Sequence, residues 1–119
     1  VLLFSAAIGL LWLSTVPQVL TGETKLSATG QTFVASTHFP AVRDTVMGRC
    51  AMCHAVVPGY EGIPYPPKNV VLDTDAAIAE HAREIYLQAG RSHAMPPGNV
   101  SGITDEERQL IVTWFEEAR

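Results

Sequence analysis

The chain has 119 residues and a mass of 12.9 kDa, which limits it to one small domain. Its 8 basic and 12 acidic residues give a formal charge of −4, and this excludes a nucleic-acid binder, which needs a basic surface to neutralise phosphates. With 47% hydrophobic and 17% charged residues the chain is too apolar for a disordered tail, and two cysteines are too few for a disulfide-rich secreted scaffold.

The most apolar part of the sequence is its beginning. Residues 1–22 carry no charged side chain, and Glu23 is the first ionisable one. Twenty helical residues at about 1.5 Å each span roughly 30 Å, the thickness of a bilayer core, so we expect a transmembrane helix over residues 1–20. Because Val1 is not Met and no basic n-region is present, a signal peptide fits less well, and a buried core helix is the third interpretation. We expect this helix to end a longer membrane domain.

The rest of the chain divides at residue 38. Residues 21–37 are polar, rich in Thr, Ser, Gly and Ala, and lack helical periodicity, which predicts a linker. Residues 38–119 then form the domain. Apolar residues at helical spacing predict three helices in it, over residues 40–50, 75–89 and 104–118. Thr74 and Gly90 are the expected N-cap and stop of the second helix.

A helix-breaking loop separates the first two helices. Four prolines lie from Pro58 to Pro67, a density that no long regular element tolerates. Thr104 and Glu107 predict a capping box at the start of the last helix. Since no strand pattern occurs, the sequence predicts an all-α domain with long loops, preceded by one transmembrane helix.

The residues that carry chemistry are concentrated in Cys50-Ala51-Met52-Cys53-His54. This C-x-x-C-H spacing is the attachment motif of c-type haem. One turn of helix places the two thiols where each can add to a vinyl group of the same porphyrin, and it holds His54 beneath the iron as an axial ligand. We therefore expect one covalent haem c, with Cys50 and Cys53 as its thioether positions.

Three other uses of the two thiols are open. A thioredoxin-like redox pair needs a βαβ setting, and the sequence shows none. A zinc site needs four well-spaced ligands, whereas Cys53 and His54 are adjacent. A structural disulfide would leave the neighbouring histidine without a role.

A second axial ligand is expected if the haem transfers electrons. Met95 is the leading candidate, since it follows the expected helix stop and precedes two prolines that stiffen its loop. A thioether opposite an imidazole stabilises ferrous iron and raises the reduction potential. His93 is the rival ligand, whereas Met47 and Met52 lie beside the attachment site. The remaining alternative is that Met95 fills the core.

Other candidate residues have weaker signals. Arg91 is a candidate to pair with a haem propionate, and a solvated arginine is an equal alternative. His81 is expected to be structural on the middle helix, and His38 to belong to the linker. Trp114 and Phe115 are expected to pack in the core.

The haem also bears on stability. A domain of about eighty residues buries little apolar surface by itself. A porphyrin supplies a large apolar plate around which three helices can pack, with the loop over 58–67 lining its crevice. We therefore predict that the form without haem is largely unfolded.

The order of these features resembles a class I cytochrome c over residues 38–119. A first helix, C-x-x-C-H, a middle helix, a Met-Pro loop and an aromatic last helix follow one another as in that family. Val46, four residues before Cys50, stands where the family often has an aromatic residue. The sequence therefore does not predict whether the usual aromatic contact between the first and last helices is made. The prediction of the haem site does not depend on this contact.

Three segments give a narrower resemblance, to the C-terminal cytochrome domain of bacterial membrane-bound urate oxidases. They are MGRCAMCHA at 47–55, LDT at 72–74 and HAREIYLQAGRSHAMPPGNV at 81–100. The resemblance implies an upstream membrane domain that oxidises urate to 5-hydroxyisourate, with electrons leaving through the haem instead of forming hydrogen peroxide. It also implies axial ligation by His54 and Met95.

Three classes of function follow. The first is an electron-transfer module that accepts electrons from a membrane oxidoreductase domain and passes them to a cytochrome or terminal oxidase of the respiratory chain. The second is a free-standing membrane-anchored cytochrome or a cytochrome subunit of a respiratory complex. The third is a haem peroxidase, which requires an open distal position that Met95 would close.

The chemistry also predicts a location. Haem is attached to c-type cytochromes outside the bacterial cytoplasm, so we expect the inner membrane, with the cytochrome domain in the periplasm. Lys25 is the single positive residue between positions 21 and 42, as expected of a flank that is not cytoplasmic. The acidic domain favours a basic surface on its electron acceptor.

Overall fold

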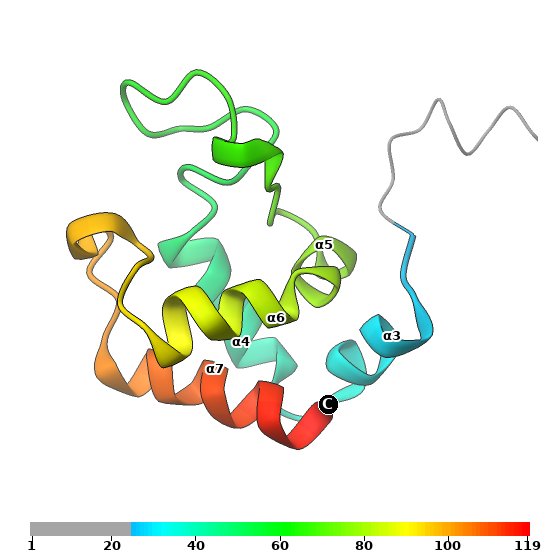
Figure 1. Ribbon diagram of the computed structural model, residues 1–119. Helices are drawn as coiled ribbons and strands as arrows, with labels where there is room; N and C mark the ends of the chain where they lie inside the picture. The colour runs from blue at the N-terminus through cyan, green and yellow to red at the C-terminus, as the bar shows by residue number, and fades with distance from the viewer. Residues whose placement is uncertain (1–24) are drawn as a thin grey trace, which may run out of the picture.

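Five α-helices occur in the described residues, 25–119 of the computed structural model (Figure 1). They are α3 (Ala28–Ala35), α4 (Phe39–Arg49), α5 (Asp75–Glu80), α6 (Ala82–Ile85) and α7 (Asp105–Ala118). A π-helical turn, η2 (Tyr86–Arg91), continues α6, and the short 3₁₀ turns η1 (Pro67–Asn69) and η3 (Pro97–Asn99) lie in loops. Over these residues the chain contains no strand.

The sequence signals at two helix starts are confirmed. The Thr74 side chain accepts a hydrogen bond from the Ala77 N–H at 3.1 Å, and so caps α5. Thr104 and Glu107 form the capping box of α7, with the Glu107 N–H donating to the threonine hydroxyl at 3.1 Å. Both caps satisfy amide groups that a helix start leaves without a partner.

The middle helix differs from its prediction. It is interrupted at His81, which has φ −100° and ψ 16°, and it then continues through η2 to Arg91, so Gly90 does not stop it. Gly90 instead allows a close approach between η2 and α7. A Cβ atom at this position would lie 3.1 Å from side-chain atoms of Ile111 and Val112.

The predicted linker is wrong for residues 28–35, which form α3. Ser27 caps this helix by accepting a hydrogen bond from the Gly30 N–H at 3.0 Å. Phe33 is buried between α3 and α7, where its carbonyl accepts a hydrogen bond from the Trp114 indole at 3.0 Å. Only Gly30 and Phe33 of α3 are buried, so the helix carries too few apolar residues to show a periodicity.

Aromatic residues join the first and last parts of the domain. The Phe39 ring at the start of α4 lies 6.1 Å from the Trp114 ring, centroid to centroid, and the Phe33 ring lies 5.2 Å from it. Val46 is fully buried. The aromatic contact with the last helix, which position 46 often makes in cytochromes c, is therefore made here by Phe39 and Phe33 with Trp114. Trp114 and Phe115 are core residues, as predicted.

The predicted fold class needs correction. The described chain is helical, but it contains five α-helices where three were expected, because α3 was missed and the middle helix is broken at His81. No helix of residues 25–119 has the length and apolar character that crossing a bilayer requires, so the expected transmembrane helix is not supported. Residues 1–20, for which it was expected, lie outside the described residues.

Candidate functional site

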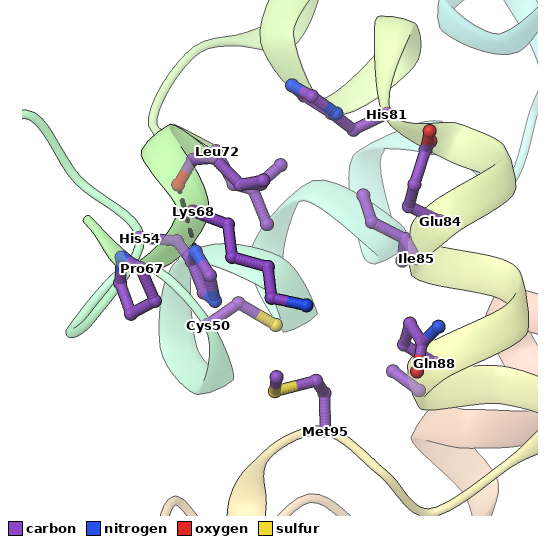
Figure 2. A pocket seen from close by; sticks show the side chains of 12 residues that line it. Cys50, His54, Pro67, Lys68, Leu72, His81, Glu84, Ile85, Gln88 and Met95 are labelled. Atoms are coloured by element: carbon purple, nitrogen blue, oxygen red, sulfur yellow. Dashed lines mark hydrogen bonds between the residues drawn. The ribbon is translucent and has the colours of Figure 1, made fainter.

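A cavity of about 330 Å³ lies between the segment that carries Cys50 and His54 and the loop that carries Met95 (Figure 2). Its other walls are formed by η1, the loop after it, α6 and η2, and it is partly open to solvent. Its walls are mainly apolar, with Leu72 and Ile85 among them. Size and lining match those of small-molecule and cofactor sites in general.

His54 is fixed in this wall by two hydrogen bonds. Its ring Nδ1 lies 2.8 Å from the carbonyl oxygen of Val70, and its own carbonyl accepts from the Leu72 N–H at 2.7 Å. Because a carbonyl oxygen can only accept, Nδ1 carries the proton. The lone pair of the ring is therefore on Nε2, which is the arrangement found in metal-binding histidines.

The two cysteines occupy different positions. Cys50 caps the C-terminal end of α4, and its sulfur faces the cavity (Figure 2). Cys53 lies one turn further on, where its N–H donates to the Cys50 carbonyl at 3.2 Å, but it does not line the cavity. Both are free thiols. The helical turn predicted for the motif is therefore present, and it brings one of its two thiols to the cavity wall.

The Cys50 thiol is not a reactive thiolate. Burial and then the neighbouring Cys53 raise the pKa of the Cys50 thiol to about 11. Reactive redox thiols have a lowered pKa and commonly lie at a helix N-terminus, whereas Cys50 lies at a C-terminus, where the helix dipole disfavours a negative charge. This weighs against the thioredoxin-like interpretation.

Met95 reaches the cavity from the opposite part of the sequence. In Figure 2 its side chain rises from the loop after η2 toward the sulfur of Cys50. Its N–H donates to the Gln88 carbonyl at 2.9 Å, and its carbonyl accepts from the Arg108 guanidinium at 2.9 Å. The structure thus brings Met95 to the same cavity as His54.

Four other candidates are placed elsewhere. Arg91 donates to the Tyr86 hydroxyl at 2.8 Å and pairs with Glu116, and it does not line the cavity. Arg91 was predicted to pair with a haem propionate, whereas in the structure it binds Tyr86 and Glu116. His93 is exposed, and Met47 is 46% exposed on α4, both outside the cavity lining. Met52 does not line the cavity either.

Several lining residues were missed or assigned another role. His81, expected to be structural, lines the cavity near Glu84 (Figure 2). Outside the cavity, His38 pairs with Glu117 at 2.9 Å instead of belonging to a linker. Lys68 extends into the cavity from a turn in which its φ is +55°, a conformation that non-glycine residues rarely adopt. Of the proline-rich loop over 58–67, only Pro67 lines the cavity.

A helical pattern in the sequence indicates part of this wall. Gln88 and Ala89 lie three and four residues after Ile85, so all three share one face of the middle helix. The loop residues carry no such signal. Lys68 comes to the cavity only because the chain turns back at η1.

The residues present fit an iron porphyrin. A porphyrin supplies the equatorial ligands of its iron, so the protein has to provide only axial ones, and one imidazole nitrogen and one thioether face this cavity. Within residues 25–119 no three His, Cys, Asp or Glu side chains are grouped as a metal site of their own. Comparisons of the chain with protein-family models, curated proteins and solved structures give no match.

Proposed function

We propose that this domain transfers electrons through one covalent c-type haem, with Cys50 and Cys53 as thioether positions and His54 and Met95 as axial ligands. The observation that carries the proposal is the convergence of His54, Cys50 and Met95, from two distant parts of the sequence, on one apolar cavity. A haem bound there supplies a one-electron couple between ferrous and ferric iron.

His54 supports the proposal through its tautomer. The hydrogen bond from Nδ1 to the Val70 carbonyl holds the ring in one orientation and keeps Nε2 free of a proton. The same bond makes the imidazole more basic and therefore a better ligand. The proline-rich loop acquires a role in this way, since it returns the chain to Val70 and Leu72 beside His54.

The apolar walls of the cavity are expected to raise the reduction potential of the haem. Leu72, Ile85 and Ala89 are buried around the cavity and exclude water from that side. A low-dielectric surrounding disfavours the additional positive charge of ferric iron, and a thioether ligand acts in the same direction. We therefore expect a higher potential than a solvent-exposed haem would have.

The electron donor and acceptor form the finer part of the proposal. The resemblance of residues 47–55 and 81–100 to membrane-bound urate oxidases supports an oxidoreductase domain that oxidises urate to 5-hydroxyisourate as the donor. A cytochrome or terminal oxidase with a basic surface is the acceptor that fits a chain of charge −4. The domain works in the periplasm under this proposal, because haem is attached there.

The first test is whether the protein carries the pigment. We expect the full chain, produced in a bacterium that attaches c-type haem, to be red and to gain the mass of one haem. Its reduced and oxidised absorption spectra should be those of a low-spin, six-coordinate iron with one sulfur ligand. A colourless product of unchanged mass contradicts the proposal, and a high-spin spectrum favours a peroxidase instead.

The second test addresses the donor. Urate added to the protein in an extract of its native cells should reduce the haem, as the rise of the reduced absorption bands would report. Xanthine, which is the same purine without one oxygen, serves as the control substrate. Haem that is reduced by other donors but not by urate contradicts the urate assignment alone.

A further inference from the structure

Arg108 is a buried cation near the start of α7, with 6% of its surface exposed. Its Nη1 donates to the carbonyl oxygens of Ala89 and Met95 at 2.8 and 2.9 Å, and to that of Ser92 at a longer 3.4 Å. No ion pair links it to a carboxylate of residues 25–119. A buried charge is costly unless polar groups surround it, so these carbonyl oxygens compensate the charge of Arg108.

The three carbonyls belong to the end of η2 and the loop that follows it. A helix end leaves its last carbonyl groups without backbone partners and gathers their partial negative charge. A single guanidinium supplies both the missing donors and the opposite charge. Arg108, a residue of the neighbouring helix α7, therefore donates hydrogen bonds to the carbonyl groups at the end of η2. No side chain of η2 itself donates to them.

This contact fixes the backbone of Met95 on both sides. The Met95 N–H donates to Gln88 in the cavity wall, and the Met95 carbonyl accepts from Arg108. With both backbone groups held, the direction in which the side chain leaves the loop is set. In Figure 2 that direction leads into the cavity.

We propose that Arg108 is the positioning residue of the Met95 ligand. It holds the loop so that the thioether faces the iron, and its positive charge beside the site disfavours ferric iron. This inference rests on the proposed function, because ligation by Met95 is part of that function. Loss of Arg108 should therefore both weaken sulfur ligation and lower the reduction potential.

The test compares three variants of the full-length holoprotein. Arg108→Gln removes the charge, Arg108→Lys keeps the charge but not the planar donor group, and Arg49→Gln is the matched control. Arg49 is also a partly buried arginine that binds a residue of α7, Glu107, and a loop carbonyl, that of Ser101, but it does not contact Met95. The sulfur-to-iron absorption band is followed against pH, the potential is measured, and hydrogen exchange is mapped over residues 88–99.

We expect Arg108→Gln to raise the fraction of protein without sulfur ligation by about tenfold. The pH at which the sulfur-to-iron absorption band is lost should fall by about one unit. Exchange over residues 88–99 should become faster, and the potential should fall. Arg108→Lys should recover part of each change. In Arg49→Gln the band and the potential should stay as in the wild type.

Two results separate this inference from the proposed function. If Arg108→Gln keeps the band, its pH profile and the potential of the wild type, Arg108 does not position Met95, and the inference is overturned. Should Arg108→Gln fail to fold, Arg108→Lys decides by the same readouts. If the wild type lacks covalent haem, or if Met95→Ala leaves the wild-type band unchanged, the proposed function itself is wrong.

Discussion

The ring Nδ1 of His54 and the carbonyl oxygen of Val70 lie 2.8 Å apart, although sixteen positions separate the two residues in the sequence. The intervening chain contains the four prolines and closes on itself through this bond and the neighbouring bond from Leu72 to His54. Two consecutive residues of left-handed backbone, Lys68 and Asn69, precede Val70 and turn the chain back. The loop therefore serves to orient one imidazole.

The first prediction concerns the proton on that ring. In the reduced holoprotein labelled with ¹⁵N-histidine, Nδ1 of His54 should carry a proton that exchanges slowly with water, because the Val70 carbonyl accepts it in a partly buried position. Nε2 should carry none. Exposed His93 is the internal control, and its ring protons should exchange fast. A proton on Nε2 instead would contradict the ligand role of His54.

The second prediction concerns the form without haem. Without haem, the mainly apolar walls of the cavity have no apolar surface to pack against, and a domain of this size has only a small net stability to lose. The variant Cys50→Ala/Cys53→Ala should therefore lose most of its helical signal in far-ultraviolet circular dichroism.

The matched control for this variant is Met52→Ala, which alters the same motif without removing a thiol. It should keep both the pigment and the helical spectrum of the wild type. A native-like spectrum of the double cysteine variant, with no haem bound, would show that the core is sufficient to hold the fold.

The third prediction concerns the sixth ligand. Met95→Ala should abolish the low-spin sulfur signature, because it removes the thioether that faces the cavity. Met47→Ala serves as the control, since Met47 is exposed on α4 and does not line the cavity. If the absorption spectrum of Met95→Ala is the same as that of the wild type, His93 becomes the ligand to test.

The fourth prediction concerns α3, which lies outside the predicted domain boundary at residue 38. Phe33 is 4% exposed and stacks on Phe115 at 5.5 Å, so Phe33→Ala should lower the free energy of unfolding by about 3 kcal/mol. Gln31→Ala, an exposed position of the same helix, should change it by less than about 0.5 kcal/mol. Equal stability of the two variants in urea denaturation would mean that α3 does not belong to the core.

The sequence predicted what short-range signals encode. The caps at Thr74 and Thr104 and the turn of the C-x-x-C-H motif all depend on residues within a few positions of one another. It did not predict that Val70 would meet His54. Such contacts across the fold are set by how the chain turns in space, which no local pattern records.

Arg108 and Arg91 illustrate the same limit. In the sequence both are arginines near a helix end, and Arg91 lies closer to Met95, so it was the more obvious partner for the cofactor. In the structure Arg91 is exposed and pairs with Glu116, whereas Arg108 is buried against the Met95 loop. Burial depends on the packing of η2 against α7, and that packing depends in turn on Gly90.

The last prediction concerns pH. The hydrogen bonds from the Arg49 guanidinium hold the pKa of Glu107 below its ordinary value of 4.5, and the capping bond to Thr104 acts in the same direction. A carboxyl group whose pKa is lowered by folding stabilises the folded state fully above its unfolded pKa, and the contribution is lost as the pH falls through the folded value. Glu107→Gln should therefore be less stable than the wild type at pH 7 by about 1 kcal/mol, a figure kept small by solvent screening of the pair. Below about pH 4 this difference should shrink.

Glu106→Gln is the control for this pH dependence. Glu106 lies in the same first turn of α7 but is exposed, and within residues 25–119 it takes part in no ion pair. Urea denaturation of the holoprotein at pH 7 and at pH 3 measures all three proteins. The difference between wild type and Glu107→Gln should be larger at pH 7, whereas Glu106→Gln should follow the wild type closely at both. A Glu107→Gln deficit that is the same at both pH values would show that the variant loses packing or capping and not the charged pair with Arg49.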